Sequence, residues 1–179
     1  MKDHLRRLIE GAPREEMKER LAREYLQARV LQGFQDDGVF IRWAFVGGTA
    51  LRFLYSIPRF SEDLDFSSLK PAGDEDTGFR AALLRAKSLF EAEGYEVAVK
   101  VKKQVGAVES ALVRFPGLPY EIGISPHPSQ VLSIKVEVDT NPPAGAVTET
   151  TLVRRHVTVN VLHHDKASLL AGKLHAVPT

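Results

Sequence analysis

The sequence lacks cysteine, and it also lacks any long apolar run. The absence of cysteine excludes a disulfide framework and a zinc site built from thiolates. No stretch approaches the roughly 18 apolar residues that a membrane-spanning helix requires. The opening residues, MKDHLRRLIEG, are charged throughout and lack the apolar centre of a secretion signal. These absences predict a cytoplasmic protein with no membrane partner.

A large excess of charge of one sign is also absent, because 24 basic residues nearly balance 23 acidic ones. The overall charge therefore argues neither for nor against a nucleic-acid partner, which only local clustering could indicate. The length of 179 residues fits one ordinary domain, and a hydrophobic content of 44% is typical of a folded protein. Disorder is therefore not expected.

Residues 1–38 are expected to form a helical segment packed on a core of residues 39–179. Within the first part, Pro13 suits a first helical turn, and the run Asp36-Asp37-Gly38 is a stop signal. Between them, apolar side chains recur at spacings of three and four, which is typical of an amphipathic helix: Met17, Leu21, Tyr25, Ala28 and Leu31.

The core segment combines strands and helices in an order that predicts an α+β fold. Periodicity predicts strands within 39–46, 61–67, 131–139 and 154–162, and a hairpin over 95–115 that turns near Gly106. It predicts a helix over 76–93 with a buried stripe of Phe79, Leu83, Leu84, Ala86, Leu89 and Phe90. A closing helix over 165–177 has the apolar pattern Leu169, Leu170, Leu174 and Val177.

The strand over 61–67 carries the first chemical signal. Leu64 and Phe66 alternate with Asp63 and Asp65, so the two carboxylates share the exposed face. Side chains at positions i and i+2 lie about 6–7 Å apart at their Cα atoms and can converge on a metal ion. Such a pair in isolation is more often a solvated strand face than a metal site.

Two glycines precede this acid pair by a short helix and a loop. Gly47-Gly48 ends the apolar strand, and Thr49 is a candidate cap for the helix that follows, through Tyr55. Glycines let backbone N–H groups approach a phosphate, and a helix N-terminus favours negative charge. A lone Gly-Gly is more often a tight turn. Here a phosphate cradle and a metal site would meet in space.

The segment GGTALRFLY (47–55) followed by RFSEDLDF (59–66) resembles the signature of the AbiEii/AbiGii-type toxin family. Looser resemblance continues through IKVEVD (134–139) and LLAGKLHA (169–176). The resemblance implies a nucleotidyltransferase core with the polymerase-β-like fold, a twisted mixed sheet with helices packed on it. Several members of that family are toxins of bacterial toxin–antitoxin pairs.

The resemblance also implies roles for individual residues. Asp63 and Asp65 would bind Mg²⁺ or Mn²⁺, with Ser61 at the rim of the site. A third carboxylate would come from a neighbouring strand, and both Glu137 and Asp139 point the same way as Lys135; Glu137 is favoured slightly for its central place. The remaining assignments are phosphate contacts or charge compensation: Gly47, Gly48, Thr49, Arg52, Arg59 and Lys173.

The implied function is transfer of a nucleoside monophosphate from a nucleoside triphosphate (NTP) to an acceptor hydroxyl, possible acceptors including RNA. A cognate antitoxin would be a partner. The rival reading is a catalytically inactive nucleotide- or protein-binding module. The family's helical C-terminal region, which carries a further Arg-Asp-type motif, has no counterpart before the sequence ends at Pro178-Thr179, which favours that rival. The crowded Asp63–Asp65 pair opposes it.

Histidines and basic clusters offer weaker signals. His163-His164-Asp165 matches no familiar zinc spacing, so a structural or surface role is expected. Lys100, Lys102 and Lys103 form one basic cluster, and Arg154-Arg155 form another. These clusters would either guide an RNA backbone or act as charged strand edges that discourage aggregation.

Overall fold

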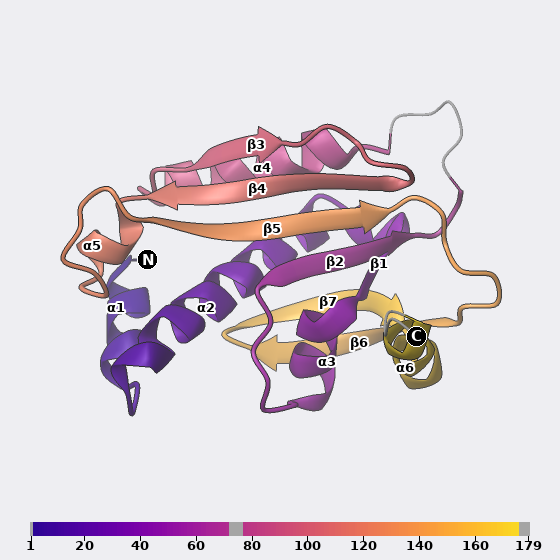
Figure 1. The fold of residues 1–179 in the computed structure, drawn as a ribbon, viewed down its shortest axis with the longest axis horizontal. Coiled ribbons are helices and arrows are strands. Elements are labelled where there is room, and N and C mark those ends of the chain that lie inside the picture. Colours follow the sequence, from indigo (N-terminus) through magenta and orange to yellow (C-terminus); the bar gives the residue numbers. More distant parts are fainter. Residues whose placement is uncertain (1, 72–76, 176–179) are drawn as a thin grey trace.

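The computed structural model describes residues 2–71 and 77–175. Within them the strands form one seven-stranded sheet in the order β3-β4-β5-β2-β1-β7-β6 (Figure 1). The strands are β1 (Trp43–Val46), β2 (Asp63–Ser68), β3 (Ala98–Val101), β4 (Val108–Pro116), β5 (Val131–Asp139), β6 (Thr148–Arg155) and β7 (Val157–His164). The pairs β1–β7 and β2–β5 are parallel, and the other neighbours are antiparallel. The sheet is therefore mixed, and the predicted α+β fold is confirmed.

Six α-helices accompany this sheet in the described ranges: α1 (Lys2–Glu10), α2 (Glu15–Asp36), α3 (Gly47–Tyr55), α4 (Phe79–Ala92), α5 (Leu118–Glu121) and α6 (Lys166–His175). A short 3₁₀ helix, Val39–Ile41, precedes β1. In Figure 1, α2 and α4 lie behind the sheet, whereas α3 is drawn on its near side. None of the described helices is both long and apolar enough to cross a membrane.

Helix α2 is the centre of the hydrophobic core. Its residue Phe34 packs against Trp43 and Phe66 on the sheet, with ring centroids 5.9 Å and 5.6 Å away. Burial extends almost all round the helix between Ala22 and Phe34 and includes Glu24 and Gln27. The predicted amphipathic stripe was too narrow, because α2 lies between the sheet on one side and α1 and α4 on others.

The middle of β2 and β5 alternates as predicted. Leu64 and Phe66 of β2 are at most 1% exposed, and Val136 and Val138 of β5 are fully buried. These residues face the helical layer, so the residues between them face the open side of the sheet. That open face is where the predicted site residues lie.

Several predicted boundaries were wrong. The strand expected over 154–162 is a hairpin of β6 and β7, turning at His156 with a φ of 60°. Helix α3 begins at Gly47 without a side-chain cap, two residues before the expected cap at Thr49. The start of the expected helix at residue 76, and Val177 of the closing helix, lie outside the described residues.

Some leucines expected in buried stripes are exposed. Leu84 and Leu89 of α4 are 43% and 45% exposed, and Leu170 and Leu174 of α6 are 49% and 76% exposed. Each helix buries a narrower stripe than its apolar periodicity predicts, because the sheet covers only one side of it. In α6 the buried leucine is Leu169, at 4% exposure.

Candidate metal and nucleotide site

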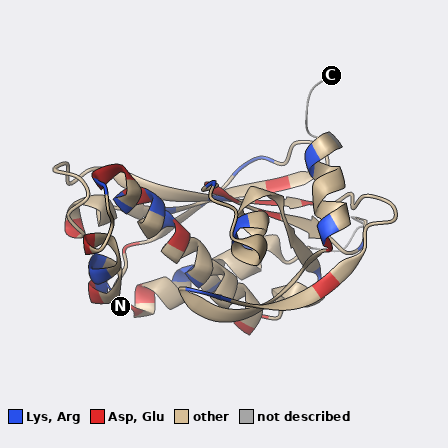
Figure 2. Ribbon diagram, turned by 90° about the horizontal axis from the view of Figure 1, so that it is seen from below, with Lys and Arg blue, Asp and Glu red and all other residues tan. Residues whose placement is uncertain are grey.

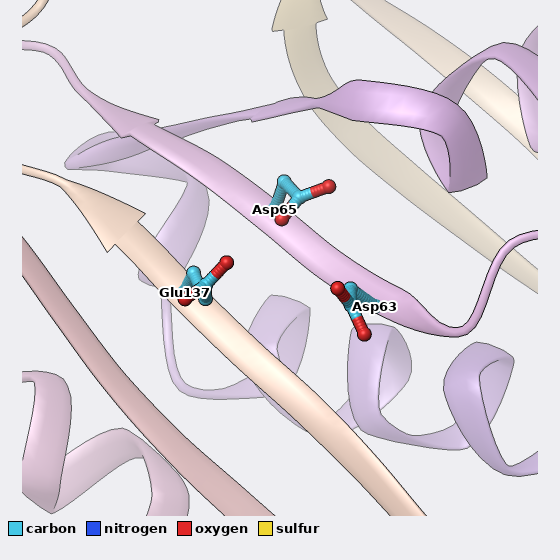
Figure 3. A group of neighbouring side chains, drawn as sticks. All are labelled: Asp63, Asp65 and Glu137. Atoms are coloured by element: carbon cyan, nitrogen blue, oxygen red, sulfur yellow. The ribbon is translucent and has the colours of Figure 1, made fainter. Parts of the chain in front are cut away.

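Three carboxylates from two neighbouring strands meet on the open face of the sheet. The parallel register of β2 and β5 aligns Asp63 with Lys135 and Asp65 with Glu137. One carboxylate oxygen from each of Asp63, Asp65 and Glu137 lies within 4.8 Å of the other two (Figure 3). Hard oxygen donors at this spacing are suited to Mg²⁺ or Mn²⁺.

The register also separates the two candidates for the third carboxylate. Asp139 aligns with Ser67, and this pair lies two residues further along each strand than the Asp65–Glu137 pair. Its Oδ1 accepts a hydrogen bond from the backbone N–H of Asn141 at 2.9 Å. Among the described residues, Asp139 does not belong to any close group of three candidate ligands. The structure therefore brings Glu137 to the acid pair and leaves Asp139 at the strand end.

Burial and mutual repulsion weaken ionisation in this group. Burial, followed by the negative charges of Asp63 and Glu137, raises the pKa of Asp65 to about 6. Burial is also the largest cause of a raised pKa at Asp63. Lys135 lies within the group, its Nζ 2.8 Å from Glu137 Oε1 and 4.0 Å from Asp63 Oδ2. A cluster of carboxylates with raised pKa values is typical of a functional site that binds a cation.

The two glycines lie directly beside this group, Gly47 against Asp65 and Gly48 against Ser61. Gly47 has a φ of +79°, and a Cβ added there would overlap the carboxyl group of Asp65. A Cβ on Gly48 would overlap the hydroxyl of Ser61 and lie 3.8 Å from Lys173 Nζ. Because these positions open helix α3, their backbone N–H groups are available to an anion. The metal group and the helix N-terminus thus border the same space.

That space is an open cleft of about 450 Å³. Its wall contains six residues predicted from sequence: Gly48, Arg59, Ser61, Asp63, Asp65 and Lys173. Phe60 and Glu62 complete the wall and had no predicted role. Cations, a hydroxyl and carboxylates therefore surround one volume large enough for part of a nucleotide.

Two predicted phosphate contacts lie elsewhere. The side chain of Thr49 is 1% exposed, and its hydroxyl donates a hydrogen bond to the carbonyl oxygen of Asp63 at 2.5 Å. The guanidinium of Arg52 binds buried Glu24 and stacks over Phe60, with its central carbon 3.5 Å from the ring centroid. Thr49 therefore supports the backbone of β2, and Arg52 supports the loop before it. The phosphate role predicted for the Arg52 side chain does not fit this geometry.

Lys135 and Gln27 are neighbours of the site that the sequence analysis did not assign. Lys135 could have been found, because it lies two positions before Glu137 on the same strand face. Gln27 could not, because it belongs to α2. It is 1% exposed, and its side-chain amide donates to the carbonyl oxygen of Ser61 at 3.1 Å.

Within residues 2–71 and 77–174, the histidines and basic clusters do not form a second group of metal ligands. His163 is 1% exposed, with a ring nitrogen 2.7 Å from the hydroxyl of Thr151, which fits the expected structural role. Lys100 lies on edge strand β3, whereas Arg154 lies on β6 at the opposite edge. In Figure 2, basic and acidic positions are interspersed along the ribbon rather than gathered on one track. Arg155 is held by Glu24, with Nη1 3.2 Å from Oε1.

The family model described as "Nucleotidyl transferase AbiEii toxin, Type IV TA system" matches residues 29–178. The chain belongs to this family. The AbiEii match begins inside α2 and includes every strand and the whole carboxylate group. It confirms the resemblance drawn from the glycine and Asp-x-Asp segments.

Two solved structures share the fold of this AbiEii chain. One is a proposed nucleotidyltransferase from H. pylori, with a TM-score of 0.56 and 22% identity over 88% of this chain and 58% of that one. The other is JHP933 from Helicobacter pylori, with a TM-score of 0.55 and 21% identity over 88% of this chain and 57% of that one. The chain thus spans little more than half the length of these structures. No curated protein sequence matches it significantly.

Proposed function

We propose that this chain is the nucleotidyltransferase toxin of a toxin–antitoxin pair and that it requires a divalent metal ion. The reaction joins an acceptor hydroxyl oxygen to the α-phosphorus of an NTP and releases pyrophosphate. The observation that carries the proposal is the meeting of Asp63, Asp65 and Glu137 beside the glycine turn that opens α3. Membership in the AbiEii family supports it independently.

The residues present fit a divalent cation. Asp63, Asp65 and Glu137 supply only oxygen donors, which Mg²⁺ and Mn²⁺ prefer, and they remain partly exposed, so an ion has access. When bound, such an ion offsets the negative charge that develops on the phosphate oxygens and acidifies the attacking hydroxyl. A cation bound here would also offset the repulsion between the carboxylates, which is the largest cause after burial of the raised pKa of Asp65.

The chain's other residues position the NTP. Backbone N–H groups of Gly47 and Gly48 bind phosphate oxygens at the N-terminus of α3, where glycine permits close approach. The ammonium group of Lys173, close to Gly48, offsets the charge of the departing pyrophosphate. The hydroxyl of Ser61, which lies directly against Gly48, donates a hydrogen bond to a phosphate oxygen beside the glycine turn. These preorganised donors act where charge develops.

RNA is the acceptor we favour, and a cognate antitoxin is the expected partner. The toxin–antitoxin description of the family supports the antitoxin. An open cleft, rather than a closed pocket, is compatible with a large acceptor such as RNA. A catalytically inactive nucleotide-binding module is the second candidate, favoured by the position of Lys135, whose ammonium group lies among the carboxylates where a metal ion would bind.

A transfer assay with NTPs labelled at the α-phosphate tests the proposal, with cellular RNA and cellular protein as separate acceptors. Asp63→Asn and Glu137→Gln should each lower transfer by roughly a hundredfold or more. Asp139→Asn removes the same charge from the same strand face as Glu137 but lies outside the carboxylate group, so it serves as the matched control. It should retain activity within a few-fold.

Thermal unfolding with each NTP and Mg²⁺ separates the two candidates. Stabilisation that disappears in Asp63→Asn, together with label transfer, supports the enzyme. Stabilisation without transfer to either acceptor class supports the binding module. Equal activity in Asp63→Asn, Glu137→Gln and Asp139→Asn would contradict any catalytic role for the carboxylate group.

A further inference from the structure

A second hollow, of about 330 Å³, opens next to the carboxylate cleft. It lies between α2 and the loop before β2, and its wall consists of Arg20, Arg23, Pro58, Arg59, Phe60, Ser61 and Glu62. Residues 59–62 belong to both walls. The second hollow therefore directly adjoins the carboxylate cleft.

Three arginines make this hollow electropositive. Arg20 and Arg59 are exposed, and neither has a hydrogen-bond or ion-pair partner among residues 2–71 and 77–175. Arg23 is held rigidly, with its two terminal nitrogens each 2.8 Å from a carboxylate oxygen of Glu19 or Glu62. Its Nε is buried and has no hydrogen-bond partner. Guanidinium groups with free N–H donors are the side chains best matched to phosphate oxygens.

The second hollow and the carboxylate cleft meet at residues 59–62 and are otherwise lined by different residues. Glu62, which binds Arg23, directly precedes Asp63. Gly47 lies against Asp65, and Lys173 lies near Gly48. Arg20 and Arg23 line only the second hollow, whereas Gly48, Asp65 and Lys173 line only the carboxylate cleft. In an in-line displacement, the attacking and leaving oxygens lie on opposite sides of the phosphorus.

We propose that the hollow lined by Arg20, Arg23 and Arg59 is the acceptor site and binds a phosphate group that neighbours the attacking hydroxyl. This inference rests on the proposed transferase function. The pyrophosphate portion of the NTP binds at the glycine turn that opens α3. The second hollow therefore recognises a phosphate carried by the acceptor. Glu62 also faces the hollow, and Arg23 compensates its charge.

The phosphate has two possible sources, a nucleic-acid end or a small phosphorylated acceptor. Arg20 is the diagnostic residue because it lines only the second hollow, whereas Arg59 lines both. Arg20→Ala removes an exposed side chain from a helix and leaves the core intact. Arg80→Ala is the matched control: Arg80 is an exposed helical arginine on α4, which packs behind the sheet.

The test measures binding of a short, fluorescently labelled single-stranded RNA with a free 3′ hydroxyl, and of a nucleoside 5′-monophosphate, with a chelator present. NTP binding with Mg²⁺ is measured separately by thermal shift. Arg20→Ala should weaken RNA binding about tenfold and reduce its salt dependence by about one ion, while NTP binding stays unchanged. Arg80→Ala should change neither.

The outcomes are separable. Weaker RNA binding assigns the site to a nucleic-acid end, and weaker binding of the monophosphate alone assigns it to a small acceptor; both support an acceptor phosphate site. The proposal is overturned when Arg20→Ala weakens NTP binding as much as acceptor binding, or when it weakens neither ligand. Because acceptor binding is measured without metal, failure of the carboxylate chemistry would not alter this result.

Discussion

The Nζ of Lys135 lies 2.8 Å from Oε1 of Glu137, two positions further along the same strand face. The hydrogen bond to Glu137 is the largest cause of a raised pKa at Lys135, so the ammonium form is stabilised. The same Nζ lies 4.0 Å from Asp63 Oδ2. A protein cation therefore occupies space between two of the carboxylates that we propose as metal ligands.

Lys135→Met should tighten binding of Mn²⁺. A unit charge about 5 Å from a divalent ion costs roughly 1.5 kcal/mol in a medium of high dielectric constant, or about tenfold in affinity. Isothermal titration calorimetry would measure the change, with Lys100→Met on strand β3 as the control. Weaker Mn²⁺ binding in Lys135→Met would instead mean that Lys135 positions Glu137 for the metal rather than competing with it.

Gly47→Ala should remove metal binding as well as stability. Gly94→Ala is the matched control, because Gly94 has a similar φ of +83° but no neighbouring atom within 4 Å of an added Cβ. The left-handed conformation alone should cost about 1–2 kcal/mol of unfolding free energy in both variants. At Gly47 the new Cβ also displaces the carboxyl group of Asp65. Urea unfolding and Mn²⁺ titration would show whether the two variants differ.

The stability of the metal-free protein should depend on the protonation of Asp65. Its pKa is raised from 3.8 to about 6 on folding, chiefly by burial, so the native carboxyl binds its proton more tightly than the unfolded one. The unfolding free energy should therefore fall as the pH rises from about 4 to about 6, and this contribution should be constant at higher pH. Thermal unfolding in the presence of a chelator would measure the slope. Asp65→Asn should reduce it, and an unchanged slope would argue against this origin.

Glu24→Gln should destabilise the fold strongly. Glu24 is 3% exposed and binds Arg52, Arg155 and His156, which joins α2 to α3 and to the β6–β7 turn. Burial alone would raise its pKa, but hydrogen bonds from His156 and Arg52, together with the arginine charges, lower it to about 2. Removing one partner of a buried ionic group costs about 3–5 kcal/mol.

The control for this variant is Glu19→Gln on the same helix. Glu19 is 43% exposed and pairs with Arg23, so its loss should cost less than about 1 kcal/mol. Urea unfolding would measure the unfolding free energy of both variants. Equal losses in the two would contradict the proposal that Glu24 is a central ionic contact of the fold. The stability that the Glu24 carboxylate contributes should be present above pH 4.5 and lost as the pH falls toward 2.

Local sequence patterns predicted the strands that carry the candidate site. The alternation of Leu64 and Phe66 with the aspartates, and the strict alternation over 131–139, each require one buried face and one open face. The glycine turn and the Asp-x-Asp pair are contiguous enough to support the family resemblance, which the match over residues 29–178 confirms. Patterns of this kind can be recognised in a sequence because they are formed by residues that lie close together along the chain.

Features that depend on distant pairing could not be predicted. The choice between Glu137 and Asp139 depends on the register of β2 against β5, and nothing within either strand specifies that register. Strand β6 was missed because its sequence, TETTLVRR, is largely polar on an exposed sheet edge. The hydrogen bond of the Thr49 side chain could not be predicted, because its acceptor, the carbonyl oxygen of Asp63, comes within reach only in the folded protein.

The parallel pairing of β2 with β5 also determines when the site can exist during synthesis. Asp63 and Asp65 leave the ribosome well before Glu137, and the two segments cannot pair until β5 has been made. Antiparallel neighbours such as β4 and β5 need only a short connection, whereas this pairing closes a long loop and forms late. A growing polypeptide therefore carries an incomplete set of carboxylates. The proposed transfer reaction therefore cannot begin before β5 has been made and has paired with β2.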